Sequence, residues 1–279
     1  LPSITSLQRI MSHFYKIQKH HCAEFIETVN TVPQAKKYME ANGGHVVASC
    51  TTKLSIIPNP FLDGWKIRQA ISVTKENPNL ETSQIEECVW GMRTDPVSGE
   101  EITSSNFGTQ FHQHIEKRLN GTSAEVDVEW CKFSNATMAW FEENVSKIFE
   151  TETTYGSLKL NTAGQIDCIA KMKDGVLSVI DYKTRAVNPE KPKSISSKTY
   201  ETDVMQLAVY ADILREHWSI PARQEIECYS IIVDTNGGST HVKKHTKESL
   251  NKQFYRAVKT LKYYDDFYDL HPPIREVAK

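Results

Sequence analysis

The sequence lacks a metal-binding cysteine motif and any segment that could cross a membrane. Its six cysteines are scattered, and none forms a C-x-x-C pair, so we predict no structural zinc and a reducing compartment. No hydrophobic run reaches the length of about 20 residues that a transmembrane helix needs, so no membrane partner is expected. No signal peptide is visible, and the chain opens with Leu1 rather than methionine, which predicts a processed protein or a trimmed form.

The chain also lacks an excess of positive charge. The 33 lysine and arginine residues are outnumbered by 35 aspartate and glutamate residues, for a net charge of -2. Proteins that bind nucleic acid are commonly basic, so this chain would need a local basic surface for such a function. There is no internal repeat and no extended low-complexity tract. The 279 residues are enough for one large domain or two modest ones.

The most informative stretch is residues 163–185, which read AGQIDCIAKMKDGVLSVIDYKTR. It contains two apolar-rich runs separated by Lys-Asp-Gly, a strong signal for a β-hairpin. A two-residue loop would set Asp167 across from Tyr182. A three-residue loop, with Gly175 in the left-handed conformation, would instead pair Asp167 with Asp181. Only the second register brings two acids together.

In that register the Cβ atoms of Asp167 and Asp181 would lie roughly 4.5–5.5 Å apart. Lys183 would share their face because strand side chains alternate. Two carboxylates that close repel unless a cation lies between them, and hard oxygen ligands suit one or two Mg²⁺ or Mn²⁺ ions. Such an ion activates water and polarises a phosphoryl oxygen, while Lys183 could orient the water or offset phosphate charge. We therefore predict phosphodiester hydrolysis with Asp167, Asp181 and Lys183 as catalytic residues.

Four pieces of the chain together resemble the RecB-like branch of the PD-(D/E)xK nuclease superfamily. They are Phe107-Gly108-Thr109-Gln110-Phe111-His112, Gly164-Gln165-Ile166-Asp167, Val179-Ile180-Asp181-Tyr182-Lys183-Thr184 and Gln206-Leu207-Ala208-Val209-Tyr210. Within that branch the chain is most similar to the mitochondrial genome maintenance exonuclease group. That similarity lies in residues 1–5, 108–119 and 164–212, and it is patchy over residues 16–106.

The resemblance implies an α/β fold with a restriction-endonuclease-like core, a mixed central sheet flanked by helices, over residues 107–279. Residues 1–106 would form a mostly helical portion that covers or arches over the cleft. It implies a monomeric, metal-dependent exonuclease of single-stranded DNA ends, flaps or splayed ends that serves mitochondrial DNA replication and repair in the matrix. Some RecB-like nucleases hold an iron–sulfur cluster with one early and three late cysteines. Since no cysteine follows Cys228, we predict no such cluster.

The resemblance also assigns further site residues. His112 falls at the histidine position and would bind or support the metal, and Glu152 is a possible further ligand, preferred to Glu150. The substrate-binding candidates are Gln206, Tyr210, Thr184, Ser3 and Thr5. Gln206 and Tyr210, four residues apart on one helix face, would position Lys183 or hold a substrate phosphate.

Residue patterns predict the remaining elements. Helices are expected over residues 7–29, 34–42, 63–76, 105–119, 137–149, 202–217 and 247–268. Strands are expected over residues 150–160 and 225–234, the latter parallel to the second strand of the hairpin because a helix connects them. Residues 45–57 are read as strands or an irregular insertion.

Two alternatives stay open on sequence alone. One is a phage or bacterial RecB-like endonuclease or exonuclease that acts in recombination. The other is a catalytically silent nucleic-acid-binding module that keeps the fold, although the presence of Asp167, Asp181 and Lys183 argues against it.

Overall fold

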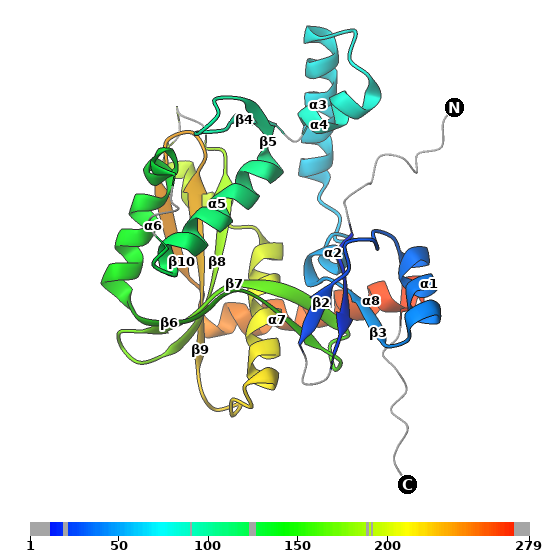
Figure 1. The fold of residues 1–279 in the computed structure, drawn as a ribbon, viewed down its shortest axis with the longest axis vertical. Coiled ribbons are helices and arrows are strands. Elements are labelled where there is room, and N and C mark those ends of the chain that lie inside the picture. Colours follow the sequence, from blue (N-terminus) through cyan, green and yellow to red (C-terminus); the bar gives the residue numbers. More distant parts are fainter. Residues whose placement is uncertain are drawn as a thin grey trace.

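The computed structural model describes residues 12–18, 22–89, 91–122, 127–187, 190 and 192–270, and Figure 1 shows a mixed α/β protein. Its centre is a five-stranded sheet in the order β10-β9-β8-β7-β6. The pair β8–β9 is parallel and the other three pairs are antiparallel. The strands are β6 (Val145–Ser157), β7 (Thr162–Met172), β8 (Leu177–Arg185), β9 (Ile226–Asp234) and β10 (Thr240–Lys244). The predicted fold class, a mixed sheet flanked by helices, is confirmed.

The hairpin between β7 and β8 has the three-residue loop. The backbone of Met172 donates to Val176 across the loop, and Gly175 has a φ of 93°, a left-handed conformation that suits glycine. The ladder ends at the pair Cys168–Ile180, one position before Asp167 and Asp181, and its register is the one that aligns these two acids. This part of the sequence prediction is confirmed.

Helices cover both faces of the sheet (Figure 1). On one face, α5 (Ser104–Leu119) and α6 (Cys131–Asn144) pack their aromatic side chains against β7, β8 and β9. On the other face lie α7 (Glu201–His217) and α8 (Lys247–Tyr268). Because α7 connects β8 to β9, these two strands run parallel, as predicted. Every residue of β9 is buried, which is typical of a strand covered on both faces.

The predicted helix over residues 137–149 is wrong beyond Asn144, where α6 ends and β6 begins. Val145 and Ile148 both pack into the core beside α6, a spacing of three that imitates a helical face. The strand achieves this spacing because its pairing with β7 shifts register between Val145 and Glu150, and such a bulge returns side chains to the same face.

The predicted helix over residues 7–29 is also wrong where the chain is described. Instead β1 (Phe14–Ile17), β2 (Ala23–Phe25) and β3 (His45–Ala48) form an antiparallel sheet in the order β2-β1-β3. The pairing of β1 with β3, some thirty residues further on, depends on contacts distant in sequence. A local hydrophobic pattern does not reveal such contacts.

The rest of the N-terminal portion is largely helical. The predicted helices over residues 34–42 and 63–76 correspond to α1 and α3, and residues 45–57 contain both β3 and the unpredicted helix α2. The elements are α1 (Val32–Asn42), α2 (Cys50–Leu54), α3 (Pro60–Glu76), α4 (Thr82–Val89), β4 (Met92–Thr94) and β5 (Glu101–Thr103).

The N-terminal portion joins the larger sheet through α2. Cys50 and Leu54 belong to the same buried cluster as residues of α7 and α8. The fully buried amine of Lys53 pairs with Asp265 of α8 and donates to the backbone oxygen of Asn161. The division into residues 1–106 and 107–279 therefore remains a prediction, because the two portions share a core.

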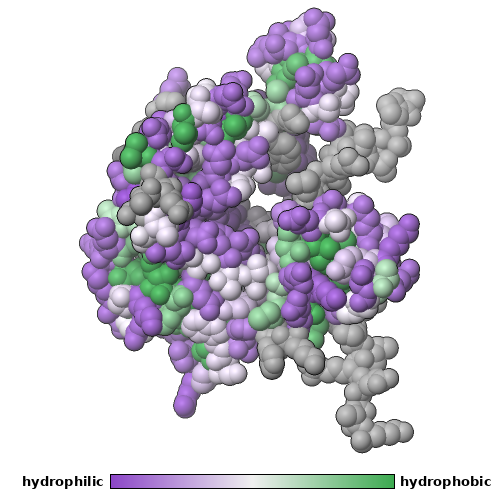
Figure 2. Space-filling view, in the orientation of Figure 1, coloured by the Kyte–Doolittle hydropathy of each residue, from purple (hydrophilic) through white to green (hydrophobic). Residues whose placement is uncertain are grey.

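Helices α3 and α4 stand apart from the sheet at the top of Figure 1. Figure 2 shows the surface hollowed between these helices and the lobe that contains the sheet, with mostly hydrophilic residues around the hollow. None of the helices in the described part of the chain is both long and apolar enough to traverse a bilayer.

Candidate active site

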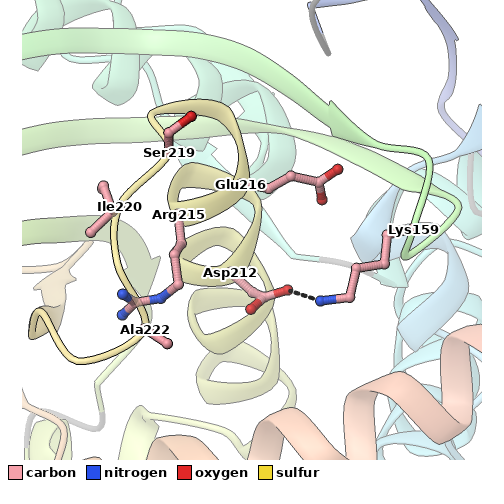
Figure 3. Close-up of a pocket in the computed structure, with 7 residues that line it drawn as sticks. All are labelled: Lys159, Asp212, Arg215, Glu216, Ser219, Ile220 and Ala222. Atoms are coloured by element: carbon pink, nitrogen blue, oxygen red, sulfur yellow. Dashed lines mark ion pairs between the residues drawn. The ribbon is translucent and has the colours of Figure 1, made fainter.

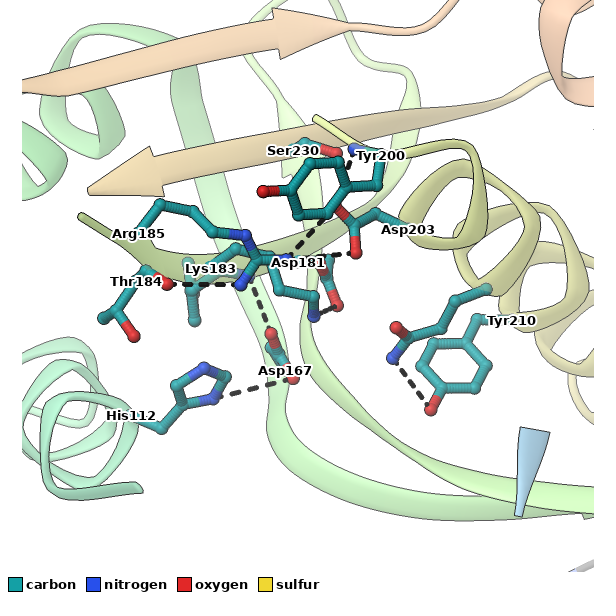
Figure 4. Close-up of polar contacts among 12 residues, drawn as sticks. His112, Asp167, Asp181, Lys183, Thr184, Arg185, Tyr200, Asp203, Tyr210 and Ser230 are labelled. Carbon is teal, nitrogen blue, oxygen red and sulfur yellow. Dashed lines mark hydrogen bonds and ion pairs between the residues drawn. The ribbon is translucent and has the colours of Figure 1, made fainter. Parts of the chain in front are cut away.

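The site forms where β7 and β8 part. Their backbone ladder runs from Lys171–Leu177 to Cys168–Ile180, and β7 then continues along β6 while β8 continues along β9. At the point of separation the carboxylate of Asp167 accepts a hydrogen bond from the backbone N–H of Tyr182, at 2.7 Å. Figure 4 shows polar side chains filling this opening between α5 and α7.

Asp181 and Lys183 lie together on β8. Nζ of Lys183 donates to Oδ1 of Asp181 at 2.6 Å, whereas the buried Oδ2 of Asp181 has no hydrogen-bond partner among the described residues. Burial raises the pKa of Asp181 to about 7, although the nearby ammonium of Lys183 opposes this shift. Burial lowers the pKa of Lys183, but Asp181 and Asp167 outweigh it, so the net direction is upward. Asp181 therefore offers a free buried oxygen, and its proton is easily exchanged near neutral pH.

His112, Glu152 and Asp167 form a second group. Nδ1 of His112 on α5 lies 3.1 Å from Oε1 of Glu152 and 3.7 Å from Oδ1 of Asp167, and ligand atoms of the three residues lie within 4.8 Å of one another. Burial lowers the pKa of His112, but the two carboxylates raise it by more than burial lowers it, so the net pKa is about 9. Burial raises the pKa of Asp167. Two acids and an imidazole crowded this closely are typical of a cation site.

The donor set fits a divalent cation. His112, Glu152 and Asp167 would hold it, and the unpaired Oδ2 of Asp181 is a further hard oxygen donor. The sequence had proposed Asp167, Asp181 and His112, with Glu152 as a possible addition. The structure gathers three of these four residues and leaves Asp181 beside Lys183, so Asp181 as a direct ligand remains a prediction.

Glu152, and not Glu150, faces this group. The register of β6 and β7 pairs Thr151 with Cys168 and Thr153 with Ile166, which sets Glu152 opposite Asp167. Glu150 instead accepts a hydrogen bond from Tyr155. Glu152 has a φ of 48°, a strained conformation for a residue with a side chain, and such strain is common at functional sites.

Tyr210 of α7 lies at the other side of the opening (Figure 4), and Gln206 precedes it by one turn of the same helix. Nε2 of Gln206 donates to the Tyr210 hydroxyl at 3.1 Å, and both side chains are buried. The hydroxyl packs directly on Gly164, where any Cβ atom would overlap it. This contact explains why a glycine precedes the strand acid by three residues. The predicted action of the pair on Lys183 or on phosphate remains a prediction.

The other predicted substrate-binding residues are Thr184, Ser3 and Thr5. Thr184 occupies the opposite face of β8 from Lys183, and its Oγ1 would lie 3.3 Å from a Cβ atom added at Gly108 of α5. Ser3 and Thr5 lie outside the described residues.

Sequence reasoning missed Arg185, which follows Lys183 by two residues and shares its face of β8. Its Nη2 donates to both carboxylate oxygens of Asp203 at 3.2 and 3.3 Å, and its guanidinium lies 5.1 Å from the ring centre of Tyr200. The regular spacing of Asp181, Lys183 and Arg185 was the signal that could have revealed it.

A separate surface pocket lies at the end of α7 (Figure 3). Lys159 pairs with Asp212 at 3.7 Å, Arg215 donates to two backbone oxygens, and Glu216 accepts from Ser157. Since its charged side chains already have partners within the protein, this pocket is a weaker candidate for the active site than the opening between β7 and β8.

A mixed sheet whose separating strands present buried acids, a lysine and a cation site defines a metal-dependent nuclease. The family model of the PD-(D/E)XK nuclease superfamily matches residues 87–272, and the chain belongs to that superfamily. Nucleases of this class use divalent metal ions and bind nucleic acid as substrate. A search of curated proteins finds no match to this chain.

Proposed function

We propose that this chain is a RecB-like exonuclease that degrades single-stranded DNA from ends, flaps or splayed ends. The observation that carries the proposal is the convergence of four sequence motifs on one opening. His112 approaches from α5, Asp167 from β7, Lys183 from β8 and Tyr210 from α7 (Figure 4). These are the pieces by which the sequence resembles the RecB-like branch.

Each residue of the site has its own role in phosphodiester hydrolysis. A bound Mg²⁺ or Mn²⁺ ion would supply Lewis-acid activation of water and of the scissile phosphate. Glu152 and Asp167 carry the negative charge that such an ion would neutralise, and His112 would add a neutral nitrogen ligand. Lys183 orients the attacking water and offsets the negative charge that develops on the phosphate. Asp181 keeps the lysine amine in place through the 2.6 Å hydrogen bond.

Preference for a single strand with a free end is supported by the surroundings of the site. Helices α3 and α4 border a polar hollow next to the lobe that contains the sheet (Figure 2). A strand passing beneath them would be selected by width, because a duplex is much wider than one strand. The N-terminal portion would then act as the covering element.

The biological setting is part of the proposal. The resemblance to the mitochondrial genome maintenance exonuclease group supports a monomeric enzyme of mitochondrial DNA replication and repair, located in the matrix. The phage or bacterial RecB-like enzyme remains the rival, since both would share the same site chemistry.

Cleavage of an end-labelled single strand tests the activity. Linear single-stranded DNA, its duplex and a circular single strand are incubated with Mg²⁺, Mn²⁺ or EDTA, using wild type and Lys183→Ala. Metal-dependent shortening of the linear strand alone, lost in the variant, is the expected result. Cutting of the circle would indicate an endonuclease, and tight binding without any cutting would identify a silent module.

A further inference from the structure

Helix α8 exposes large aromatic side chains on its outer face. Tyr255, Tyr263 and Phe267 are 63%, 62% and 67% exposed, respectively. The rings of Tyr263 and Phe267 are stacked, with centres 6.2 Å apart and planes 27° apart. Core-facing positions of the same helix are filled by other residues, including Leu261 and Tyr264. The exposed rings therefore contribute nothing to the core and are available to a ligand.

Lysines alternate with these rings. Lys252, Lys259 and Lys262 are exposed on the same face, and none pairs with a carboxylate of another described residue. Nζ of Lys259 lies 4.3 Å from the ring centre of Tyr255. This combination of aromatic planes and free ammonium groups matches the bases and phosphates of a single strand.

The charge of this segment contrasts with that of the whole chain. Helix α8 contains five lysine or arginine residues and three acidic ones, and one of these acids, Asp265, is buried in an ion pair with Lys53. The complete chain has a net charge of -2. A local basic surface is what an acidic nuclease needs to hold a polyanion, and α8 supplies it.

The same face connects to the surroundings of the active site. Arg256 on α8 donates to Glu201 at the start of α7, at 2.8 Å. Tyr200, the preceding residue, is 46% exposed and stacks with Arg185 of β8. Arg185 follows Lys183 by two residues on the same strand face. The aromatic and basic side chains thus continue from the catalytic strand onto α8.

We propose that the outer face of α8, the aromatic–lysine track of Lys252, Tyr255, Lys259, Lys262, Tyr263 and Phe267, binds single-stranded DNA outside the active site. Bases stack on the rings and phosphates contact the lysines. The track holds the part of the strand that lies away from the scissile bond. This inference rests on the proposed function, because it assumes that the substrate is a single strand.

Binding measured in the Lys183→Ala background tests the track without cleavage. Fluorescence anisotropy compares labelled single strands of about 8 and about 40 nucleotides. A single-strand-binding site in other proteins covers on the order of 4–16 nucleotides, so the short strand fills one such site and the long strand extends beyond it. The track variants are Tyr263→Ser/Phe267→Ser and Lys252→Gln/Lys259→Gln/Lys262→Gln. The matched control is Lys147→Gln/Phe149→Ser on edge strand β6, which removes another lysine and ring in contact, 5.0 Å apart.

Both track variants should weaken binding of the long strand by about tenfold or more and binding of the short strand by less than about twofold, because only the long strand reaches the track. The lysine variant should also lower the salt slope of log K by about 2, since each phosphate contact on a single strand contributes about 0.7. The control should bind both strands like its parent. Unchanged thermal midpoints would verify that the variants fold.

Other outcomes separate the two proposals. If the parent protein binds the long strand and wild type shortens it, but the track variants bind normally, the track is refuted and the exonuclease stands. If neither length binds and no strand is cut, the proposed function itself fails. If the track variants lose binding to anionic phospholipid vesicles but not to DNA, the face is a membrane contact and the proposal is overturned.

Discussion

Lys183 and Asp181 share a 2.6 Å hydrogen bond in which only one oxygen of the aspartate takes part. The other oxygen is buried and finds no hydrogen-bond partner in the part of the chain that the structure describes. A buried acceptor left unpaired costs folding free energy, so this pair is expected to serve chemistry at the expense of stability.

Asp181→Asn should therefore separate the two properties. Removing the buried charge should raise the free energy of unfolding by about 1 kcal/mol in EDTA, while cleavage should fall by a factor on the order of 10²–10³. Urea denaturation and single-turnover cleavage measure the two effects. Glu225→Gln, at an exposed acid in the loop before β9, is the control and should change neither. Lower stability in Asp181→Asn would contradict this interpretation.

Metal binding should release a proton from His112. Its pKa is about 9 without an ion, because Asp167 and Glu152 outweigh the effect of burial, and a metal binds only the neutral imidazole. Apparent metal affinity should thus rise as pH increases toward 9. Calorimetry of Mn²⁺ binding at pH 7.5, in buffers of different ionisation enthalpy, counts the protons. His112→Gln should release about one proton fewer, and equal release in both proteins would exclude His112 as a ligand.

Two glycines should respond differently to alanine. Gly164→Ala forces a methyl group into the Tyr210 hydroxyl, so it should destabilise the protein by about 1–3 kcal/mol and reduce cleavage. Gly108→Ala places a methyl group 3.3 Å from Oγ1 of Thr184 and gains helix propensity of up to about 1 kcal/mol, so its stability should be unchanged or higher. Thermal midpoints distinguish the two, and equal losses would refute the special role of Tyr210.

Acid should destabilise the fold through His114. Burial and the neighbouring Arg118 lower its pKa to about 4, and the ring hydrogen-bonds to Ser134 at 2.8 Å. Because the pKa of this histidine is lower in the folded state, its contribution to stability is fully present above about pH 6.5. The contribution declines as the pH falls toward 4, because the unfolded state takes up the proton first.

The measurement compares urea midpoints at pH 7.5 and pH 5.0 in wild type and His114→Gln, with EDTA present. The wild type should lose about 1–2 kcal/mol more than the variant over this interval. His241→Gln, at a partly exposed histidine of β10, serves as the control. An identical pH dependence in all three proteins would rule out the contribution of His114.

The local sequence was sufficient for the hairpin and its acids. Lys173-Asp174-Gly175 between apolar runs specifies a loop, and strand alternation then fixes which side chains share a face. The helix over residues 105–119 and the strand–helix–strand crossover through α7 were predictable for the same reason. In each of these elements the decisive information lies within a few neighbouring residues.

Errors arose where distant contacts decide the local structure. Residues 14–17 and 23–25 become strands because β1 pairs with β3, and Val145 joins a strand because β6 pairs with β7. A short apolar pattern fits a helix and a bulged strand equally well. The competing hydrogen bonds come from segments that the pattern does not contain.

The sequence alone predicted the hairpin and the set of acids and lysine that indicates a metal-dependent nuclease, because these follow from spacing along two strands. The fold class was predicted from the resemblance to the nuclease superfamily. The structure chose the three-residue loop between the two registers that the sequence allowed. Only the tertiary structure decided that His112 and Glu152 lie beside Asp167 while Asp181 pairs with Lys183. It also decided that the face of α8 with the aromatic and lysine residues is left exposed by the neighbouring elements. Such groupings depend on how separate elements pack, and no single segment encodes them.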